Sequence, residues 1–353
     1  MEISELRKKI DALDAKIVGL LNDRAQISLV IGEQKVKNNK SIYAPDREKE
    51  VLKKIKTMSK GPMPSSGLEA VYREIMSSSL SLEKNLRIAY LGPQASFTNL
   101  AAAKKFGSQV EYVSCGNISE VFQRVESDDC DYGVVPIENS IEGAVTHTFD
   151  LLVDSELKIC SQILLEIAQN LMAKGSTKNI KEIYSKMEVF GQCRRWLQLN
   201  MPQAELIDVS STAKAAQVVG KKKNAACIAS EMAAKVYGLT IIKHNIQDIQ
   251  HNITRFLVLT KSDVAPTGKD RTSLVCSIKD RVGALHKMLE PFSKNKINLT
   301  KIESRPSKRK AWEYYFFIDI EGHKLNPHVQ KAIAQLEPLC NYVKILGSYP
   351  VLE

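Results

Sequence analysis

The sequence His251-Asn252-Ile253-Thr254-Arg255-Phe256 places an amide, a hydroxyl and a guanidinium at the start of an apolar run. That run, Leu257-Val258-Leu259, predicts a buried strand. A core strand has no need of these polar groups together. Spacing alone leaves two interpretations open: a loop in which Asn252 caps a turn and Arg255 is solvated, or a site that binds an anion and donates a proton.

The chain before this segment alternates short apolar strands with helices. Strands are expected at residues 86–91, 110–113 and 132–136, with helices at 99–106 and 118–125. The same alternation recurs between about residue 167 and about residue 245. This pattern predicts an α/β domain with a parallel sheet, built as two lobes that leave a cleft between them.

Polar residues gather where the expected strands end. Glu138, Asn139 and Ser140 follow the strand at 132–136, and packing alone does not explain them. Ser or Thr also stands at the start of several expected helices: Ser96, Thr98, Ser211, Thr212 and Ser230. Each alone is most simply a helix N-cap. If several met in one cleft, their hydroxyls and the neighbouring backbone N–H groups would form a cradle for an anion.

Taken together and in order, several separated motifs resemble prephenate dehydratase over residues 86–262. They are the segments 92–98, 135–143, 184–193, 211–216 and 252–256. The resemblance implies a bilobal α/β fold like that of the periplasmic ligand-binding proteins, with prephenate in the cleft. It implies that Thr254 is the catalytic proton or hydrogen-bond donor and that Arg255 anchors the side-chain carboxylate. The other implied prephenate-binding residues are Ser96, Glu138, Asn139, Ser140, Ser185, Gln192, Ser211, Thr212 and Asn252.

The reaction implied for this domain removes a ring carboxylate as CO₂ and a ring hydroxyl as water, which makes the ring aromatic. The departing hydroxyl therefore has to be protonated. Because a threonine hydroxyl is a poor free acid, Thr254 is expected to act by preorganised donation in a site that excludes water.

The N-terminal segment has the pattern of one long helix. Residues 3–38 contain no proline, and apolar residues recur at alternating spacings of three and four: Ile3, Leu6, Ile10, Leu13, Ile17, Leu20, Ile27 and Ile31. Such a helix would be roughly 50 Å long, so it needs a partner, and a homodimer of paired helices is the simplest one. Arg24 falls in the apolar series, where a cation can specify register or pair with a carboxylate.

A further helix is expected from about residue 65 to residue 83. Ser79 and Glu83 continue its apolar face, one turn apart. Polar groups thus stand at apolar positions on two different helices, Arg24 on one and this pair on the other. Such a set suggests an enclosed anion site.

Residues 1–84 resemble the all-helical chorismate mutase family. The resemblance rests on Leu6-Arg7, Ile10-Asp11, Leu13-Asp14, residues 20–24, Lys35, Asp46-Arg47-Glu48, Ser79 and Glu83. It implies an intertwined three-helix dimer in which Arg7 reaches into the partner's site. Arg7, Arg24 and Arg47 would then hold the carboxylates of chorismate, and Glu48 and Ser79 would also bind it. The catalytic residues Lys35 and Glu83 would meet the ether oxygen. A carboxyl donates a hydrogen bond only when protonated, so mutase activity is expected to rise toward mildly acidic pH.

Residues 271–350, which follow a linker at 262–270, predict a βαββαβ order, the ferredoxin-like arrangement. Two segments resemble the ACT amino-acid-binding domain, namely Gly283-Ala284-Leu285-His286 and Glu303-Ser304-Arg305-Pro306. The resemblance implies that L-phenylalanine binds between two such domains and causes feedback inhibition.

Composition bounds these readings. The chain has 353 residues, 44% of them hydrophobic and 25% charged, which is typical of a multidomain globular protein. The net charge of +10 suits anionic substrates better than nucleic acid, since the basic residues form only short tracts. Seven cysteines without a Cys-x-x-Cys pair and six scattered histidines predict a cytoplasmic protein with no metal site and no cofactor. No segment resembles a signal peptide or a membrane span.

The combined expectation is a multidomain bifunctional enzyme: chorismate to prephenate to phenylpyruvate, inhibited by L-phenylalanine, as a homodimer or tetramer. Two alternatives stay open. In one, the helical domain binds chorismate without turning it over. In the other, the chain is an aromatic-acid sensor without catalysis.

Overall fold

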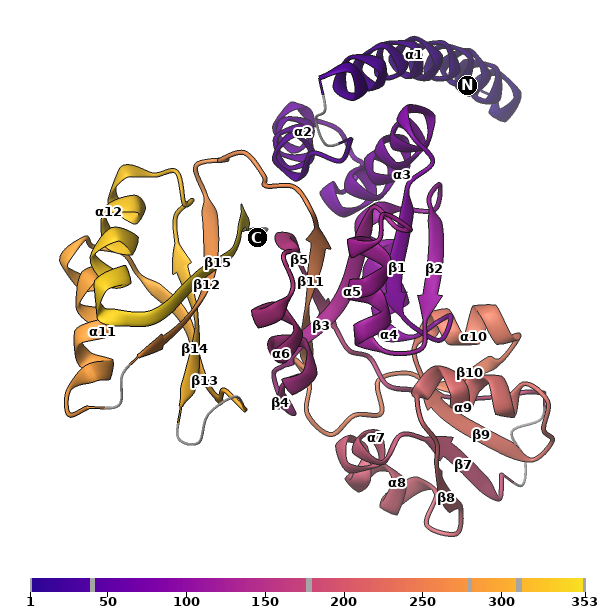
Figure 1. The fold of residues 1–353 in the computed structure, drawn as a ribbon. Helices are drawn as coiled ribbons and strands as arrows, with labels where there is room; N and C mark the ends of the chain where they lie inside the picture. Colours follow the sequence, from indigo (N-terminus) through magenta and orange to yellow (C-terminus); the bar gives the residue numbers. More distant parts are fainter. Residues whose placement is uncertain (1, 39–41, 176–179, 279–280, 309–312, 352–353) are drawn as a thin grey trace. The chain divides into compact units, whose positions relative to one another are not determined.

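The computed structural model describes residues 2–38, 42–175, 180–278, 281–308 and 313–351. It divides into two compact units. The first, the helical unit, comprises residues 1–87 together with 105–111, and the second comprises residues 88–104 and 112–353. Each is described by itself (Figure 1).

The helical unit contains the predicted long helix. Helix α1 (Ile3–Lys37) has 35 residues, and α2 (Pro45–Met58) and α3 (Ser65–Glu83) follow it. Gly32 lies where α1 meets α3, because a Cβ added there would stand 2.8 Å from Cγ of Glu83. Glycine at this position lets the two helices approach closely beside a predicted catalytic carboxyl.

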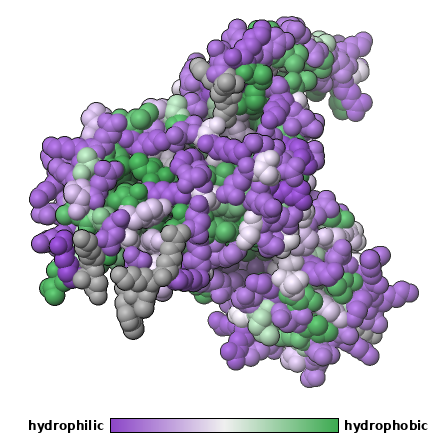
Figure 2. All heavy atoms as spheres, in the orientation of Figure 1, coloured by the Kyte–Doolittle hydropathy of each residue, from purple (hydrophilic) through white to green (hydrophobic). Residues whose placement is uncertain are grey.

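The apolar series of α1 is exposed within one chain. Ile3, Ile10 and Ile17 are 71%, 55% and 52% exposed, and Ser28 and Gly32 are the buried residues of this helix. Figure 2 shows apolar side chains at the surface in the region of α1, mixed with hydrophilic ones. An apolar stripe of this length on a helix normally packs against another element.

The second unit begins with a bilobal domain. The first lobe is a mixed sheet in the order β2-β1-β3-β11-β5, with β4 paired to β3. Its strands are β1 (Arg87–Leu91), β2 (Glu111–Cys115), β3 (Tyr132–Asn139), β4 (Gly143–Ala144), β5 (Lys158–Glu166) and β11 (Ile253–Thr260). Its helices are α4 (Phe97–Phe106), α5 (Ile118–Glu126) and α6 (Thr146–Asp154).

The second lobe is a sheet in the order β10-β6-β9-β7-β8. Its strands are β6 (Asn170–Ala173), β7 (Glu182–Ser185), β8 (Glu205–Asp208), β9 (Ala225–Ala229) and β10 (Thr240–Lys243). Its helices are α7 (Met187–Gln192), α8 (Arg194–Asn200), α9 (Thr212–Val219) and α10 (Glu231–Tyr237). The chain enters this lobe after β5 and returns to the first lobe as β11 (Figure 1).

The prediction of a parallel sheet holds for β1 with β3 and for β7 with β8 and β9. It is wrong for β11, which runs antiparallel to both β3 and β5, and for β6, which runs antiparallel to both β9 and β10. A returning strand enters the sheet from the second lobe, so its direction is set by the crossover and not by a βαβ unit.

The C-terminal domain has the predicted βαββαβ order. It consists of β12 (Asp270–Ile278), α11 (Ala284–Lys294), β13 (Leu299–Pro306), β14 (Tyr314–Glu321), α12 (Pro327–Leu336), a short 3-10 helix (Glu337–Leu339) and β15 (Cys340–Pro350). Its sheet, in the order β13-β14-β12-β15, packs against the first lobe. Leu346 and Tyr349 share one buried apolar cluster with Ile159 and Leu257, so the two domains have a common core.

Candidate functional site

A cleft of about 1080 Å³ lies between the two lobes of the second unit. The first lobe contributes the ends of β1 and β3 and the start of β11, and the second contributes α7 and the start of α9. The predicted prephenate-binding residues that line this cleft are Ser96, Asn139, Gln192, Ser211, Thr212, Asn252 and Thr254. Residues far apart in sequence therefore meet as expected.

Thr254 is fixed by the side chain opposite it. Strand register pairs Thr254 with Asn139, whose Nδ2 donates to Thr254 Oγ1 at 2.8 Å. Oδ1 of Asn139 accepts from the backbone N–H groups of Ile141 at 2.9 Å and Glu142 at 3.0 Å, which settles which amide atom is the nitrogen. The hydroxyl oxygen of Thr254 is therefore an acceptor for Asn139, and its own proton can be donated to another group.

Side chains that line the cleft link its two lobes by hydrogen bonds. Nδ2 of Asn252 donates to Oε1 of Gln192 at 3.2 Å, and Nε2 of Gln192 donates to Oε1 of Glu142 at 3.0 Å. Asn252 also accepts from Asn139 at 2.6 Å. Thr254 is thus held within a network whose members come from both lobes.

The N-terminus of α9 faces the cleft. Ser211 caps this helix, since its Oγ accepts from the backbone N–H of Lys214 at 3.0 Å, and Thr212 begins the helix. Lys186 and Lys214 are the two cationic residues among those that line the cleft. Helix N-termini and ammonium groups both favour an anion.

Sequence reasoning missed these two lysines as site residues. Both lie next to residues that it selected: Lys186 follows Ser185, and Lys214 lies within the 211–216 motif. The charge was therefore visible in the motifs themselves. A buried thiol also lines the cleft: burial raises the pKa of Cys115 to about 11, so this group is a neutral thiol and not a nucleophile at neutral pH.

Four residues expected to bind prephenate lie outside this lining: Glu138, Ser140, Ser185 and Arg255. Neighbouring residues of a strand point to opposite faces, so Thr254 and Arg255 cannot both face the cleft. Arg255 instead binds Asp319 at 2.7 Å and Glu138 at 3.0 Å. Ser185 is fully buried and donates to the carbonyl of Ile228 at 2.9 Å, and Ser140 accepts from the backbone N–H of Ile253 at 2.9 Å.

In the helical unit, α1 and α3 of one chain form two contacts between predicted chorismate residues, Arg24 with Ser79 and Lys35 with Glu83. Nζ of Lys35 contacts Oε2 of Glu83 at 2.8 Å and donates to the carbonyl of Ile42 at 2.6 Å. Arg24 donates to the hydroxyl of Ser79. The side chain of Glu83 is only 8% exposed, so this cation–carboxyl pair lies in the protein interior.

The remaining predicted chorismate residues are placed differently. Arg7 is exposed on α1, and Arg47 is exposed and pairs with Glu50 at 2.6 Å. Glu48 accepts from the hydroxyl of Tyr43 at 2.6 Å and from Nζ of Lys105 at 2.9 Å. The contact with Lys105 was not foreseen, because 57 residues separate the two in sequence.

The two predicted effector segments lie at the same end of the C-terminal sheet. Register pairs Ser277, near the end of β12, with Tyr315, and pairs Tyr315 with Arg305 on the edge strand β13. Gly283, which follows β12 in sequence, caps α11 with a φ of +77°, a conformation that favours glycine. Arg305 lies 3.7 Å from Glu303 on the same strand. Residues 283–286 and 303–306 can therefore contribute to one site.

Two further findings concern the described residues as a whole. Within them, no group of three or more His, Cys, Asp or Glu side chains is arranged to hold a metal ion. None of their helices combines the length and hydropathy required to cross a membrane.

Comparison with known proteins gives three consecutive family matches. Residues 6–84 match the family model for type II chorismate mutase, residues 88–264 that for prephenate dehydratase, and residues 272–338 that for the ACT domain.

Relatives share this whole arrangement. The bifunctional chorismate mutase/prephenate dehydratase of Aquifex aeolicus is 48% identical, over 99% of this chain and 98% of its own length. The enzyme of the same description from Escherichia coli K12 is 30% identical, over 98% of this chain and 95% of its own. Among solved structures, the prephenate dehydratase of Arthrobacter aurescens in complex with L-Phe covers 75% of this chain and 90% of its own, at 31% identity and a TM-score of 0.71.

Proposed function

The chain belongs to the family of bifunctional chorismate mutase/prephenate dehydratases, and on this premise we propose how its own side chains carry out the two reactions. The helical domain rearranges chorismate to prephenate, the bilobal domain converts prephenate to phenylpyruvate, and L-phenylalanine inhibits through the ACT domain. We assign the second reaction to Thr254. The main support is the hydrogen bond that Asn139 Nδ2 donates to Thr254 Oγ1.

Thr254 donates its proton to the ring hydroxyl of bound prephenate. The carbon–oxygen bond breaks and the hydroxyl leaves with a proton as water. The bond to the ring carboxylate breaks as well, its electron pair completes the aromatic ring, and CO₂ departs. The Thr254 oxygen regains its proton from solvent after the products leave, so each turnover consumes one proton from solvent. The donor role of Thr254 is supported by its place in the cleft and by the amide that fixes its oxygen as an acceptor.

The carboxylates of prephenate bind at the start of α9 and beside the lining lysines. Ser211, Thr212, Lys186 and Lys214 supply hydroxyls, N–H groups and positive charge from the second lobe. Thr254 and Asn139 approach from the first lobe. Ser96, Gln192 and Asn252 complete the proposed set, while Arg255 is left out because its guanidinium is engaged elsewhere.

Chorismate is held by Arg24, Lys35, Ser79 and Glu83, together with Arg47 and Glu48. A Claisen-type rearrangement needs no nucleophile; it needs a folded substrate and groups that stabilise charge on the ether oxygen. The contact between Lys35 and Glu83 supports placing both at that oxygen. Arg7 is the remaining cation expected to hold a chorismate carboxylate, and we propose that a second copy of the chain supplies it.

The exposed apolar stripe of α1 supports this homodimer. Pairing two α1 helices would cover Ile3, Ile10 and Ile17, which a single chain leaves exposed. L-phenylalanine binds at residues 283–286 and 303–306, between two ACT domains. We also propose a cytoplasmic location, supported by seven cysteines without a Cys-x-x-Cys pair.

A time course with the purified full chain tests this function. Chorismate is supplied, and prephenate and phenylpyruvate are followed with and without L-phenylalanine. We expect transient prephenate, then phenylpyruvate, and slower phenylpyruvate formation with the effector. Lys35→Met should abolish conversion of chorismate but not of supplied prephenate. If parent protein leaves chorismate unchanged yet consumes prephenate, the helical domain only binds chorismate.

A further inference from the structure

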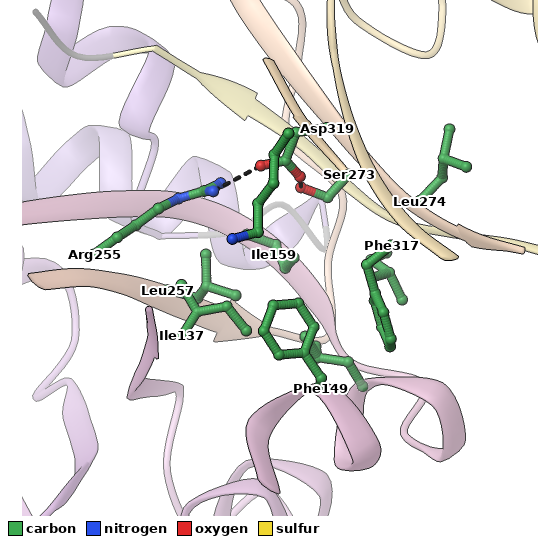
Figure 3. Close-up of a pocket in the computed structure, with 12 residues that line it drawn as sticks. Ile137, Phe149, Ile159, Arg255, Leu257, Ser273, Leu274, Phe317 and Asp319 are labelled. Carbon is green, nitrogen blue, oxygen red and sulfur yellow. Dashed lines mark hydrogen bonds and ion pairs between the residues drawn. The ribbon is translucent and has the colours of Figure 1, made fainter. Parts of the chain in front are cut away.

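The side chains that face away from the cleft form a buried junction with the ACT sheet. Arg255 is 7% exposed, and its Nη1 contacts Asp319 at 2.7 Å and Glu138 at 3.0 Å, while Nη2 donates to the hydroxyl of Tyr349 at 2.7 Å. Figure 3 shows the Arg255 side chain extending from β11 to Asp319, above an apolar group that includes Ile137 and Leu257.

Every strand of the ACT sheet contributes to this junction. Ser273 of β12 donates to Asp319 of β14 at 2.5 Å and contacts the hydroxyl of Tyr349 of β15 at 2.7 Å. Lys301 of β13 pairs with Glu138. The whole sheet is therefore tied to two side chains of the first lobe, Arg255 and Glu138.

Arg255 and Glu138 are adjacent in sequence to Thr254 and Asn139, the two residues that form the hydrogen bond in the cleft. Register pairs Thr254 with Asn139 and Arg255 with Glu138, and a bulge follows between Arg255 and Phe256. Because strand residues alternate between faces, one step along β3 and β11 separates the junction from the cleft. A shift of the junction would therefore act on residues directly bonded to Thr254 and Asn139.

The charges in the junction make it sensitive to position. Burial opposes the charge on Arg255, but Tyr349 and Asp319 outweigh that effect and raise its pKa. Burial likewise opposes the charge on Glu138, but Lys301 and Arg255 lower its pKa below the ordinary value. Two buried or half-buried charges of each sign are balanced only while all four stay in contact.

We propose that Arg255 and Glu138 are positioning residues through which the ACT sheet sets the geometry of Thr254 and Asn139, with Lys301 as the contact that carries the effector signal. Lys301 and Glu303 lie on the same face of β13, two residues apart, and Glu303 belongs to the effector segment. This inference rests on the proposed effector site. L-phenylalanine inhibits, on this view, by favouring a position of β13 that moves Lys301 relative to Glu138.

The test compares Lys301→Met with Lys344→Met in the full chain. Methionine keeps most of the apolar stem and removes the ammonium group. Lys344 is the matched control, since it also joins the two domains, donating to the carbonyls of Val153 at 2.9 Å and Ser155 at 2.6 Å, away from Glu138. Dehydratase turnover, its inhibition by saturating L-phenylalanine, and L-phenylalanine binding by calorimetry are measured for each.

We expect Lys301→Met still to bind L-phenylalanine, while the factor by which saturating L-phenylalanine slows dehydratase turnover falls by about tenfold. Lys344→Met should be inhibited like the parent. Arg255→Gln should lower dehydratase kcat with little change in KM, Arg255→Lys should recover part of it, and mutase activity in the same chain should be unchanged. Full inhibition of Lys301→Met by L-phenylalanine would refute the proposal that Lys301 transmits the effector signal. An equal loss of inhibition in Lys344→Met would refute it as well. A parent enzyme insensitive to L-phenylalanine would instead refute the proposed feedback.

Discussion

Replacing Asn139 by Asp tests the direction of the hydrogen bond at the dehydratase site. The two side chains have the same shape, and an Asp carboxylate can still accept from the N–H groups of Ile141 and Glu142, so the turn after β3 should survive. What changes is the group that faces Thr254. The donor at 2.8 Å becomes an acceptor, and the hydroxyl of Thr254 would donate to it instead of to prephenate.

The expected loss follows from the contacts that reverse. Loss of one preorganised donor to a departing oxygen costs about 10²–10³ in kcat, or about 3–4 kcal/mol. A carboxylate would also face the Oδ1 of Asn252, now 2.6 Å from the Asn139 nitrogen, and would add a negative charge beside a dianion. We therefore expect dehydratase kcat to fall by at least about 10²-fold, with a smaller rise in KM.

The assay follows phenylpyruvate formed from supplied prephenate by single-turnover and steady-state kinetics. Chorismate mutase activity of the same protein and its thermal midpoint report whether the fold is intact, since a reversed buried contact can itself cost about 1–3 kcal/mol. Dehydratase kcat within about threefold of the parent, in a folded Asn139→Asp enzyme, would show that the Thr254 hydroxyl needs no hydrogen-bond donor at residue 139.

Four further predictions follow from the same geometry. Lys214→Met should raise the dehydratase KM for prephenate by about tenfold with a smaller effect on kcat, because it removes a cleft cation; steady-state kinetics measure this, and an unchanged KM would exclude the role. Glu83→Gln provides a donor at every pH, so mutase activity should lose the rise toward acid expected of the parent, as a pH–rate profile will show. Gly32→Ala should destabilise the helical unit by about 1–3 kcal/mol and slow the mutase, because a Cβ would lie 2.8 Å from Glu83 Cγ; denaturant melts that match the parent would contradict it. The pKa of Glu138 is lowered in the folded state, because Lys301 and Arg255 outweigh the opposing effect of burial. Its contribution to stability is therefore present above its ordinary pKa and lost as pH falls through the lowered folded pKa, so the unfolding free energies of the parent and Glu138→Gln should converge at acid pH.

Local patterns in the sequence were enough to predict much of this structure. The spacing of Ile3, Leu6, Ile10 and Leu13 predicted a helix over residues 3–38, and α1 spans Ile3–Lys37. The βαββαβ order of the last domain follows from period and turn residues in the same way. Thr254 and Asn139, 115 residues apart, were assigned to one site through motifs, and they are in hydrogen-bond contact.

Long-range partners were out of reach for physical reasons. Strand periodicity does not tell which strands are neighbours, so the antiparallel placement of β11 could not be predicted. The partner of Glu48, Lys105, lies outside the helical segment in sequence. The linker composition of residues 262–270 indicates a domain boundary but does not show whether the two domains pack together. Leu346 and Tyr349 in fact share a core with the first lobe. A buried apolar face in the sequence does not identify the element that covers it.

Arg255 is the instructive case, because its orientation could have been predicted. The resemblance implies that Arg255 and Thr254 both bind the substrate, which would require both side chains to face the cleft. Adjacent residues in a strand point to opposite faces, which is a rule of local geometry. Applied to Ile253–Thr260, it separates the residue that faces the cleft from the one that binds Asp319.

The role of the Thr254 hydroxyl is tested most simply by following chorismate in a Thr254→Val enzyme, with Thr254→Ser as the control. Valine keeps the shape and removes the hydroxyl, and serine restores a donor. We predict that Thr254→Val accumulates prephenate at the parent's mutase rate and forms almost no phenylpyruvate, while Thr254→Ser forms both products. Phenylpyruvate formation by Thr254→Val at the parent rate would show that Thr254 is not the proton donor.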